Sequence, residues 1–349
     1  ERFKLTTGQG KKLMANCFIR YNDTVLLIGT QSGIVVNTPT KQYLQPLTHR
    51  AQNQAVFSMA FDFKNRLIVG TNQTILRMHS WMQFDTLRGS TPDMMQQMVS
   101  TRVSTIDNIE AKYPLIISNF YGHFLVLIDS NFEANYMVLL HGNQIENLVY
   151  KVLVDKNQNI WCAGATYGLH SINKIEKHEV DLPPKLFGAL LGSYNPFHLN
   201  TNDLSFDKHA YLFAPGKPYI LYNADQQYNV LDILPFSDST YIVSIMGNGL
   251  HYFNPNTAKH YTSIKSDQKT FRGLQLDANH NIWAISGNYL VRYNTTKKTW
   301  LHIDVNDGLP ASGLNNTMYN DKLFFYAGGM GYYIKFNPLS IDSSLTRQP

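Results

Sequence analysis

Two stretches of this chain, 122 residues apart, have nearly the same sequence. The first runs Asp155-Lys-Asn-Gln-Asn-Ile-Trp161 and the second Asp277-Ala-Asn-His-Asn-Ile-Trp283. Self-similarity at a distance indicates a fold built from repeated units. A motif that repeats belongs to the scaffold more often than to a site, so we expect the functional residues to lie where the units differ.

The repeated unit contains four short apolar segments separated by polar turns. Its second segment can be recognised eight times, at 26–30, 67–71, 115–119, 160–164, 210–214, 241–245, 282–286 and 323–327. Successive segments start 41, 48, 45, 50, 31, 41 and 41 residues apart. These spacings are close to the roughly 40–45 residues of a four-stranded propeller blade. We therefore predict an all-β fold, a β-propeller of four-stranded antiparallel blades, with 1–338 as a single propeller and 339–349 as a tail or linker.

The two ends of the chain contain incomplete units. Arg2-Phe-Lys-Leu-Thr6 reads as a fourth strand with no preceding three, and the segment 323–337 supplies a second and a third strand with no fourth. We predict that the N-terminal strand completes the last blade, because an unpaired strand edge invites aggregation. We count eight units, with seven as the alternative, because the fifth, at 185–232, is the weakest.

Composition narrows the class of protein. Aromatic residues make up 13% of the chain, which favours strands. The net charge of +5 comes from scattered Lys and Arg, whereas a nucleic-acid binder gathers them on one face. No apolar run approaches the ~20 residues that cross a bilayer. We predict no nucleic-acid partner and no membrane contact by this region. No signal peptide is recognisable, so we expect a piece of a longer chain or a mature form.

The cysteines and histidines give no sign of a metal site or a catalytic site. Cys17 and Cys162 lie in different strand-like runs, which favours two buried thiols over a disulfide. The 12 histidines show no metal-ligand spacing, and the chain has no serine elbow or phosphate loop. His170 and His251 occupy equivalent Gly-Leu-His positions, as scaffold residues do. We predict no catalytic residues, no metal and no cofactor.

The motif and the end of the chain resemble a known family. The order Asp-x-x-x-Asn-Ile-Trp, small residues, Gly-Leu and Tyr-Asn, followed by Asn306-Asp-Gly-Leu-Pro310, resembles the two-component regulator propeller repeat. The segment 307–338 resembles the last propeller blade in the periplasmic sensor region of hybrid two-component systems. The resemblance covers the chain in outline and is strong at 145–175 and 270–338.

That resemblance implies a setting for the chain. It implies that the chain is the periplasmic ectodomain of an inner-membrane protein, and that this parent protein has histidine kinase and response regulator parts. It also implies two partners, an adjacent β-sandwich domain of the same protein and a second copy in a homodimer. It assigns structural roles to the repeat residues, here Asp155, Trp161, Asp277 and Trp283. The same roles follow physically, because Asp bonds backbone N–H groups in turns and Trp packs between neighbouring blades.

Binding residues are expected on the loops from second to third strands and from fourth to next first strands, which share one face of a propeller. Rings stack on sugars, while amides and guanidinium groups bond hydroxyl or acidic groups. The candidates are Asn119, Tyr121, His123, Tyr167, Arg102, Tyr194, His198 and Arg272. We predict a non-enzymatic sensor that responds to a glycan or oligosaccharide. Two alternatives stay open: a propeller lyase or glycosidase with channel-facing histidines and carboxylates, and a protein-interaction platform.

Overall fold

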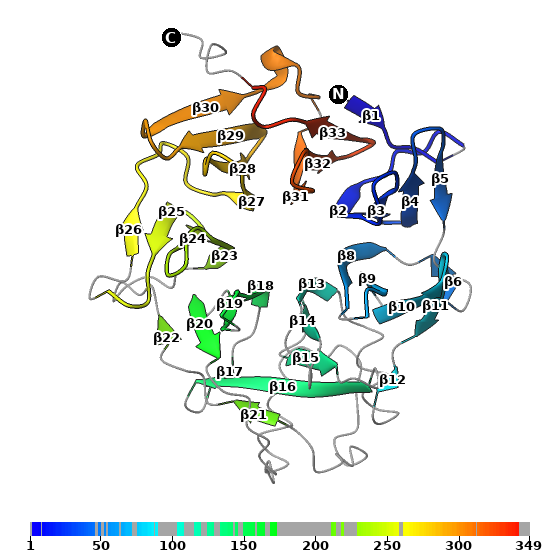
Figure 1. Ribbon diagram of the computed structural model, residues 1–349, viewed down its shortest axis with the longest axis horizontal. Coiled ribbons are helices and arrows are strands. Elements are labelled where there is room, and N and C mark those ends of the chain that lie inside the picture. The colour runs from blue at the N-terminus through cyan, green and yellow to red at the C-terminus, as the bar shows by residue number, and fades with distance from the viewer. Residues whose placement is uncertain are drawn as a thin grey trace. The chain divides into compact units, whose positions relative to one another are not determined.

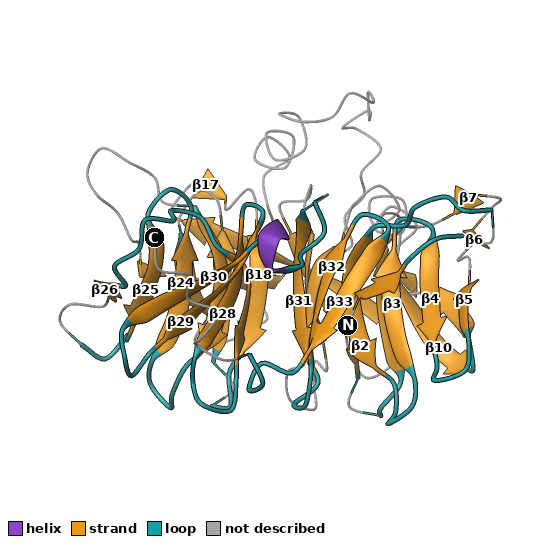
Figure 2. Cartoon of the chain, turned by 90° about the horizontal axis from the view of Figure 1, so that it is seen from above, coloured by secondary structure: helices purple, strands orange, loops and turns teal. Residues whose placement is uncertain are grey.

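The computed structural model describes the chain in segments. They are residues 2–7, 9–45, 48–49, 52–53, 55–62, 64–71, 75–86, 88–89, 103–107, 115–119, 124–128, 133–141, 144–145, 149–157, 159–164, 168–172, 211–213, 218–219, 229–257, 261–311 and 313–341. Regular structure in these segments is β-strand, apart from one 3-10 turn, η1 (Val305–Asp307, purple in Figure 2). The predicted all-β class is confirmed. No helix in the described segments has the length and apolar character that a membrane crossing requires.

The chain divides into two compact units. Unit 1 comprises 1–60, 69–72 and 228–349, and unit 2 comprises 61–68 and 73–227. Unit 1 contains four four-stranded sheets, whose strands are labelled in Figure 1. One sheet consists of β23 (Val230–Pro235), β24 (Tyr241–Ile245), β25 (Gly249–Phe253) and β26 (Tyr261–Ser263), and the next of β27 (Arg272–Leu276), β28 (Ile282–Ser286), β29 (Tyr289–Asn294) and β30 (Thr299–Ile303). The last sheet consists of β31 (Leu314–Asn320), β32 (Phe325–Gly329), β33 (Tyr332–Phe336) and β1 (Arg2–Lys4). The first sheet consists of β2 (Ala15–Arg20), β3 (Leu26–Thr30), β4 (Gly33–Asn37) and β5 (Gln42–Gln45). A small hairpin of β6 (Thr48–His49) and β7 (Gln52–Asn53) also belongs to unit 1.

Unit 2 contains two sheets. One has the order β18 (Val149–Val154), β19 (Ile160–Gly164), β20 (Leu169–Ile172) and β22 (Pro218–Tyr219). The other has the order β12 (Arg88–Gly89), β16 (Glu133–His141), β15 (Phe124–Ile128), β14 (Leu115–Asn119) and β13 (Val103–Asp107), and both β17 (Gln144–Ile145) and β21 (Tyr211–Phe213) pair with β16. A further sheet has residues in both units: β8 (Val56–Phe61), β9 (Leu67–Thr71), β10 (Ile75–Ser80) and β11 (Gln83–Thr86).

Seven of the eight predicted second segments form the strand that pairs with the first strand of a described sheet. They are β3, β9, β14, β19, β24, β28 and β32, and only β32 is displaced, beginning at Phe325 instead of Leu323. The segment at 210–214 differs. In the described segments, its strand β21 pairs in parallel with β16 and does not form the second strand of a separate sheet. Most of the predicted fifth unit lies outside the described residues, so the number of units stays a prediction.

The N-terminal strand completes the last sheet, as predicted. β1 pairs antiparallel with β33, with Phe3 opposite Tyr333 and Lys4 opposite Tyr332. The rings of Phe3 and Tyr333 stack with centroids 4.8 Å apart, and the Leu5 amide donates to the Gly331 carbonyl at 2.7 Å. Figure 1 shows β1 beside β33, so the two ends of the chain share one sheet.

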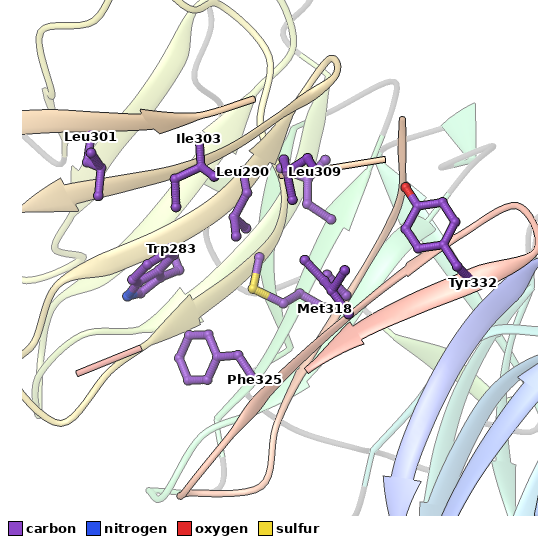
Figure 3. Packing of buried hydrophobic residues seen from close by; sticks show 11 residues of the cluster. Trp283, Leu290, Leu301, Ile303, Leu309, Met318, Phe325 and Tyr332 are labelled. Carbon is purple, nitrogen blue, oxygen red and sulfur yellow. The ribbon is translucent and has the colours of Figure 1, made fainter. Parts of the chain in front are cut away.

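Apolar clusters join consecutive sheets of unit 1. The cluster between β27–β30 and β31–β33 contains Trp283, which is fully buried, with Met318 and Phe325 from the next sheet (Figure 3). The Trp283 ring meets Phe325 at 6.0 Å and Phe336 at 5.2 Å between centroids. A buried aromatic ring removes about 150–250 Å² from water, so Trp283 is a principal contact between these sheets. Its predicted place between neighbouring sheets is confirmed.

Polar side chains also connect the first strands of neighbouring sheets in unit 1. Each bond runs from a side chain of one first strand to the backbone at the next: the Leu274 amide donates to Asp232 (3.0 Å), Gln275 to the Met318 carbonyl (3.1 Å), Asn315 to the Ala15 carbonyl (2.6 Å) and Asn16 to the Val56 carbonyl (2.7 Å). The strands that supply these side chains, β23, β27, β31 and β2, each carry a register shift, as do β13 and β18. Such bulges redirect side chains at sheet rims, which places these polar groups toward the adjoining strand.

Candidate functional site

The repeat motif forms a closed hydrogen-bond cluster in unit 1. Asp277 is buried, and its Oδ1 accepts from the backbone amides of Asn279 and Asn281, both at 2.9 Å. Its Oδ2 accepts from the Asn281 side chain and from the indole Nε1 of Trp283, also both at 2.9 Å. One carboxylate therefore shapes the turn and satisfies the polar edge of a buried indole. The motif is scaffold, as predicted.

The other copy repeats this geometry in unit 2. Asp155 accepts from the amides of Asn157 (2.8 Å) and Asn159 (2.9 Å), from the Asn159 side chain (2.9 Å) and from Trp161 Nε1 (3.1 Å). Trp161 is 3% exposed. The four hydrogen bonds occupy both oxygens of this buried carboxylate.

Sequence reasoning missed a variant of this motif in the last sheet. Asp321 Oδ1 accepts from the amides of Leu323 (3.1 Å) and Phe324 (2.7 Å), in a turn one residue shorter than that of Asp277. Its Oδ2 accepts from Tyr326 Oη (2.8 Å) and from Arg20 Nη2 (2.5 Å) of the first sheet. Arg20 Nη2 also donates to Tyr326 Oη, and the Arg20 amide to Tyr319 Oη at 3.1 Å. The ion pair thus joins the first sheet to the last.

The environment of this ion pair changes the ionisation of its members. Burial favours the neutral form of Asp321, but hydrogen bonds from Arg20, Phe324, Tyr326 and Leu323 outweigh it, so the pKa of Asp321 lies below its ordinary value. Burial, followed by the bond to Asp321, raises the pKa of Tyr326. The cluster therefore holds one carboxylate, one guanidinium and a neutral phenol at neutral pH.

A pocket of about 830 Å³ opens beside this cluster, between the sheets β31–β33–β1 and β2–β5 of unit 1. Arg20, Asp321 and Tyr326 line it together with Lys4, Lys41 and other residues of the turns that join first to second and third to fourth strands. Ligand pockets in proteins range over roughly 300–1,000 Å³, so this one is large enough for a small ligand. Nothing in the sequence predicted it, because its lining comes from both ends of the chain.

Only part of the predicted binding face can be placed. Arg272 begins β27 in unit 1 at a register shift and is partly buried, and its guanidinium makes no hydrogen bond or ion pair with another described residue. Asn119 ends β14 in unit 2, where its backbone alone is described. Six candidates lie outside the described residues: Arg102, Tyr121, His123, Tyr167, Tyr194 and His198. These eight residues therefore stay a prediction as a site.

His251 belongs to the core. It is 1% exposed, and its Nε2 lies 3.2 Å from the Asn248 carbonyl, to which a ring N–H donates. Burial lowers the pKa of His251, and the bond to Asn248 opposes that effect. His170 and His251 hold equivalent backbone register, opposite the third residue of their second strands, Cys162 and Val243. The scaffold role predicted for His251 agrees with this position.

Neither Cys17 nor Cys162 forms a disulfide with another described residue, and Cys162 is fully buried whereas Cys17 is partly so. Burial raises the pKa of Cys17, which keeps that thiol protonated. Within the described part of the chain, no three His, Cys, Asp or Glu side chains gather as a metal site requires.

Comparison with known proteins identifies the fold. No family model matches the chain, and no curated protein matches it in sequence. The extracellular domains of two putative hybrid two-component systems of B. thetaiotaomicron align with it. BT4673 gives a TM-score of 0.65 at 15% identity over 95% of this chain, and BT3049 a TM-score of 0.65 at 16% identity over 98%. The chain spans only 39% and 42% of those structures.

Two other kinds of protein align over their whole length. Virginiamycin B lyase from Staphylococcus aureus gives a TM-score of 0.65 at 10% identity, covering 97% of this chain and 98% of the lyase. The WD40 β-propeller domain of Doa1 gives a TM-score of 0.59 at 11% identity, covering 99% and 98%. These likenesses establish the fold, and the chain is a β-propeller.

Proposed function

We propose that this chain is the sensor propeller of a two-component regulatory system, located outside the cytoplasmic membrane, and that it binds a glycan without transforming it. The observation that carries the proposal is the alignment of 95% and 98% of the chain with the extracellular domains of two hybrid two-component systems. The resemblance of 307–338 to the last blade of such sensors supports it independently of the fold.

The scaffold is suited to holding loops in place. Buried carboxylates fix the turns at Asp155 and Asp277, and side-chain bonds join neighbouring first strands. Function concentrates on loops that rigid scaffolds position. Arg272 is the first residue of the first strand β27, and its guanidinium makes no hydrogen bond or ion pair with another described residue. We propose that it binds the ligand with Asn119, Tyr121, His123, Tyr167, Arg102, Tyr194 and His198.

The proposal extends to the rest of the protein. In this role the propeller contacts an adjacent β-sandwich domain and dimerises, and the parent protein is an inner-membrane histidine kinase with its sensor region in the periplasm. These partners follow from the resemblance to the two-component regulator propeller repeat. Co-expression of the propeller with the segment encoded after it, followed by size-exclusion chromatography with light scattering, tests both contacts.

A second candidate function is lyase activity. It is favoured by the alignment with virginiamycin B lyase over 97% of this chain and 98% of the lyase. Against it, His251 is buried and bonded to a backbone carbonyl, so it is not available to substrate. Release of unsaturated or shortened products from polysaccharides, or cleavage of virginiamycin B, would support the lyase and contradict the sensor.

The test of the sensor proposal is calorimetric titration of the chain with a panel of plant, host and microbial oligosaccharides. We expect one class to bind and to remain intact in the product analysis. Arg272→Ala and Tyr121→Ala should each weaken binding about tenfold or more, since each removes a charged hydrogen bond or a stacking surface. Lys297→Ala, on the exposed turn between β29 and β30, is the control and should leave affinity unchanged. Binding that both site variants leave unaltered would refute the assignment of this face.

A further inference from the structure

A series of aromatic rings lies along the boundary between the sheets β23–β26 and β27–β30 of unit 1. The ring of His302 is 6.0 Å from that of Tyr289 and 6.4 Å from that of Trp300, measured between centroids. Trp300 in turn meets Tyr293, its partner on β29, at 4.9 Å. Residues two positions apart on a strand point to the same side, so these four rings lie on one face of the sheet β27–β30.

The series continues onto the neighbouring sheet. The Lys298 ammonium lies 5.8 Å from the centre of the Tyr252 ring, on β25, and 6.0 Å from that of Tyr293. Tyr252 meets Phe236 at 5.3 Å, and Phe236 meets His280 at 5.8 Å. We call these rings together the aromatic band: Tyr289, His302, Trp300, Tyr293, Tyr252, Phe236 and His280. It extends from the start of β29 to the turn between β27 and β28, which lie at opposite ends of the strands.

Part of the aromatic band belongs to the core and part lies at the surface. Tyr293 is 6% exposed and belongs to the apolar cluster between the two sheets. Three rings are partly buried against that cluster: Phe236, Tyr252 and Trp300. The rings at the two ends, Tyr289 and His302 at one and His280 at the other, are exposed. Packing between the sheets accounts for the middle of the band, whereas its ends present ring surface to solvent.

The exposed rings also have polar groups that the rest of the described structure does not use. Neither the Tyr289 hydroxyl nor the ring nitrogens of His302 and His280 make a hydrogen bond or ion pair with another described residue. The same holds for the Tyr252 hydroxyl, and burial, followed by the neighbouring Tyr293, raises its pKa, so it stays protonated and can donate. Tyrosine hydroxyls and histidine nitrogens supply both donors and acceptors, as bonding to a sugar hydroxyl requires.

We propose that the aromatic band is a binding surface for an oligosaccharide chain, which lies along the boundary between the two sheets. The rings stack on the apolar faces of the sugar units, and the tyrosine and histidine groups bond their hydroxyls. Because the rings follow one another, several units of the chain bind at once. Arg272 apart, the candidates of the predicted sensor face belong to unit 2, whereas the band belongs to unit 1. The inference is argued from the rings and does not depend on the sensor role.

A proline-rich peptide fits the aromatic band less well. Such peptides dock against aromatic side chains, but proline has no N–H, so their backbone carbonyls need donors from the protein. The indole N–H of Trp300 already donates to the Lys265 carbonyl at 2.8 Å. Trp300 therefore offers a ligand ring surface alone, which a sugar face can use and a peptide carbonyl cannot.

Trp300 gives a direct readout of binding at the aromatic band. The chain has 4 tryptophans, and two of them, Trp161 and Trp283, are 3% and 0% exposed. Collisional quenching of fluorescence by acrylamide therefore reports on Trp81 and Trp300, and in a Trp81→Phe chain it reports on Trp300. A ligand on the band covers Trp300 and lowers this quenching.

The test titrates the Trp81→Phe chain with cellohexaose, xylohexaose and mannohexaose, each beside its disaccharide. We expect at least one hexasaccharide to protect Trp300 from acrylamide and to bind about tenfold or more tighter than its disaccharide, because it contacts more rings. Tyr289→Ala combined with His302→Ala should weaken hexasaccharide binding about tenfold, and both side chains are exposed, so the fold tolerates their loss. Leu323→Ala, which removes a 72% exposed side chain from a turn of the last sheet, is the control and should leave affinity unchanged.

Each other outcome overturns the proposal. Failure of every hexasaccharide to protect Trp300, or equal affinity for hexasaccharide and disaccharide, excludes a chain lying along the rings. Unchanged affinity in the Tyr289→Ala, His302→Ala variant excludes those rings as the contact, and tighter binding of a proline decamer assigns the band to a peptide. Arg272→Ala separates this site from the sensor face and should leave the protection of Trp300 unchanged. A hexasaccharide that binds without protecting Trp300 and weakens in Arg272→Ala occupies the sensor face, which overturns the band and supports the proposed function.

Discussion

The hydrogen bond between Asp277 and Trp283 gives a sharp prediction for stability. Asp277→Ala removes all four acceptor contacts, and two of their donors, the Asn281 side chain and the Trp283 indole, are buried. The two backbone amides belong to a surface turn that can relax toward water once the carboxylate is gone, so they contribute little. Each buried donor left unpaired costs about 1–3 kcal/mol. We expect Asp277→Ala to lower the free energy of unfolding by about 2–6 kcal/mol.

A double-mutant cycle isolates the indole contribution. Phe has no N–H, so in a Trp283→Phe background the Asp277→Ala change leaves one buried donor unpaired instead of two. We expect its cost to fall by about 1–3 kcal/mol in that background. Urea unfolding followed by circular dichroism gives the four free energies. Additive effects of the two changes would refute the reasoning, because they would show that the indole N–H gains nothing from the carboxylate.

Two further predictions concern the contacts of the first sheet. Gly29→Ala should destabilise the chain by about 1–3 kcal/mol, because the new Cβ would lie 2.5 Å from both Cys17 Sγ and a Val56 methyl; an unchanged melting temperature would contradict this packing. Asp321→Asn should cost more stability at pH 7 than in acid. A carboxylate with a lowered pKa stabilises the fold above its unfolded pKa of about 3.9 and loses that effect as pH falls through its folded pKa. Urea midpoints of wild type and variant should therefore converge as pH falls, and a gap independent of pH would contradict the ion pair.

The strands of this fold were predictable because their signal is local. Six second strands begin and end at the residues predicted, since each is a short apolar run and all but β24 end at a small or polar residue. β32 was misplaced by two residues because Leu323 is apolar yet 72% exposed in the turn. The segment at 210–214 was predicted as the second strand of its own unit, whereas β21 pairs in parallel with β16, and that pairing depends on residues distant in sequence.

The polar contacts between sheets could not be predicted from the sequence. Arg20 and Asp321 are 301 positions apart, and no local pattern distinguishes Asp321 from other turn carboxylates. The pocket was missed for the same reason, since it forms only when β1 joins β33. On the predicted binding face, Arg272 was expected in the loop before its first strand, whereas it is the first residue of β27, because the length of a loop is not encoded in the repeat spacing.

The central structural claim is that the N-terminal strand completes the last sheet and holds it to the first. Hydrogen exchange in the intact chain and in a chain lacking residues 1–7 tests it most directly. We predict that removing β1 will lower the protection of amides in β33 and in β2, while amides of β24 in the distant sheet of unit 1 keep theirs. Unchanged protection throughout β33 would contradict the account.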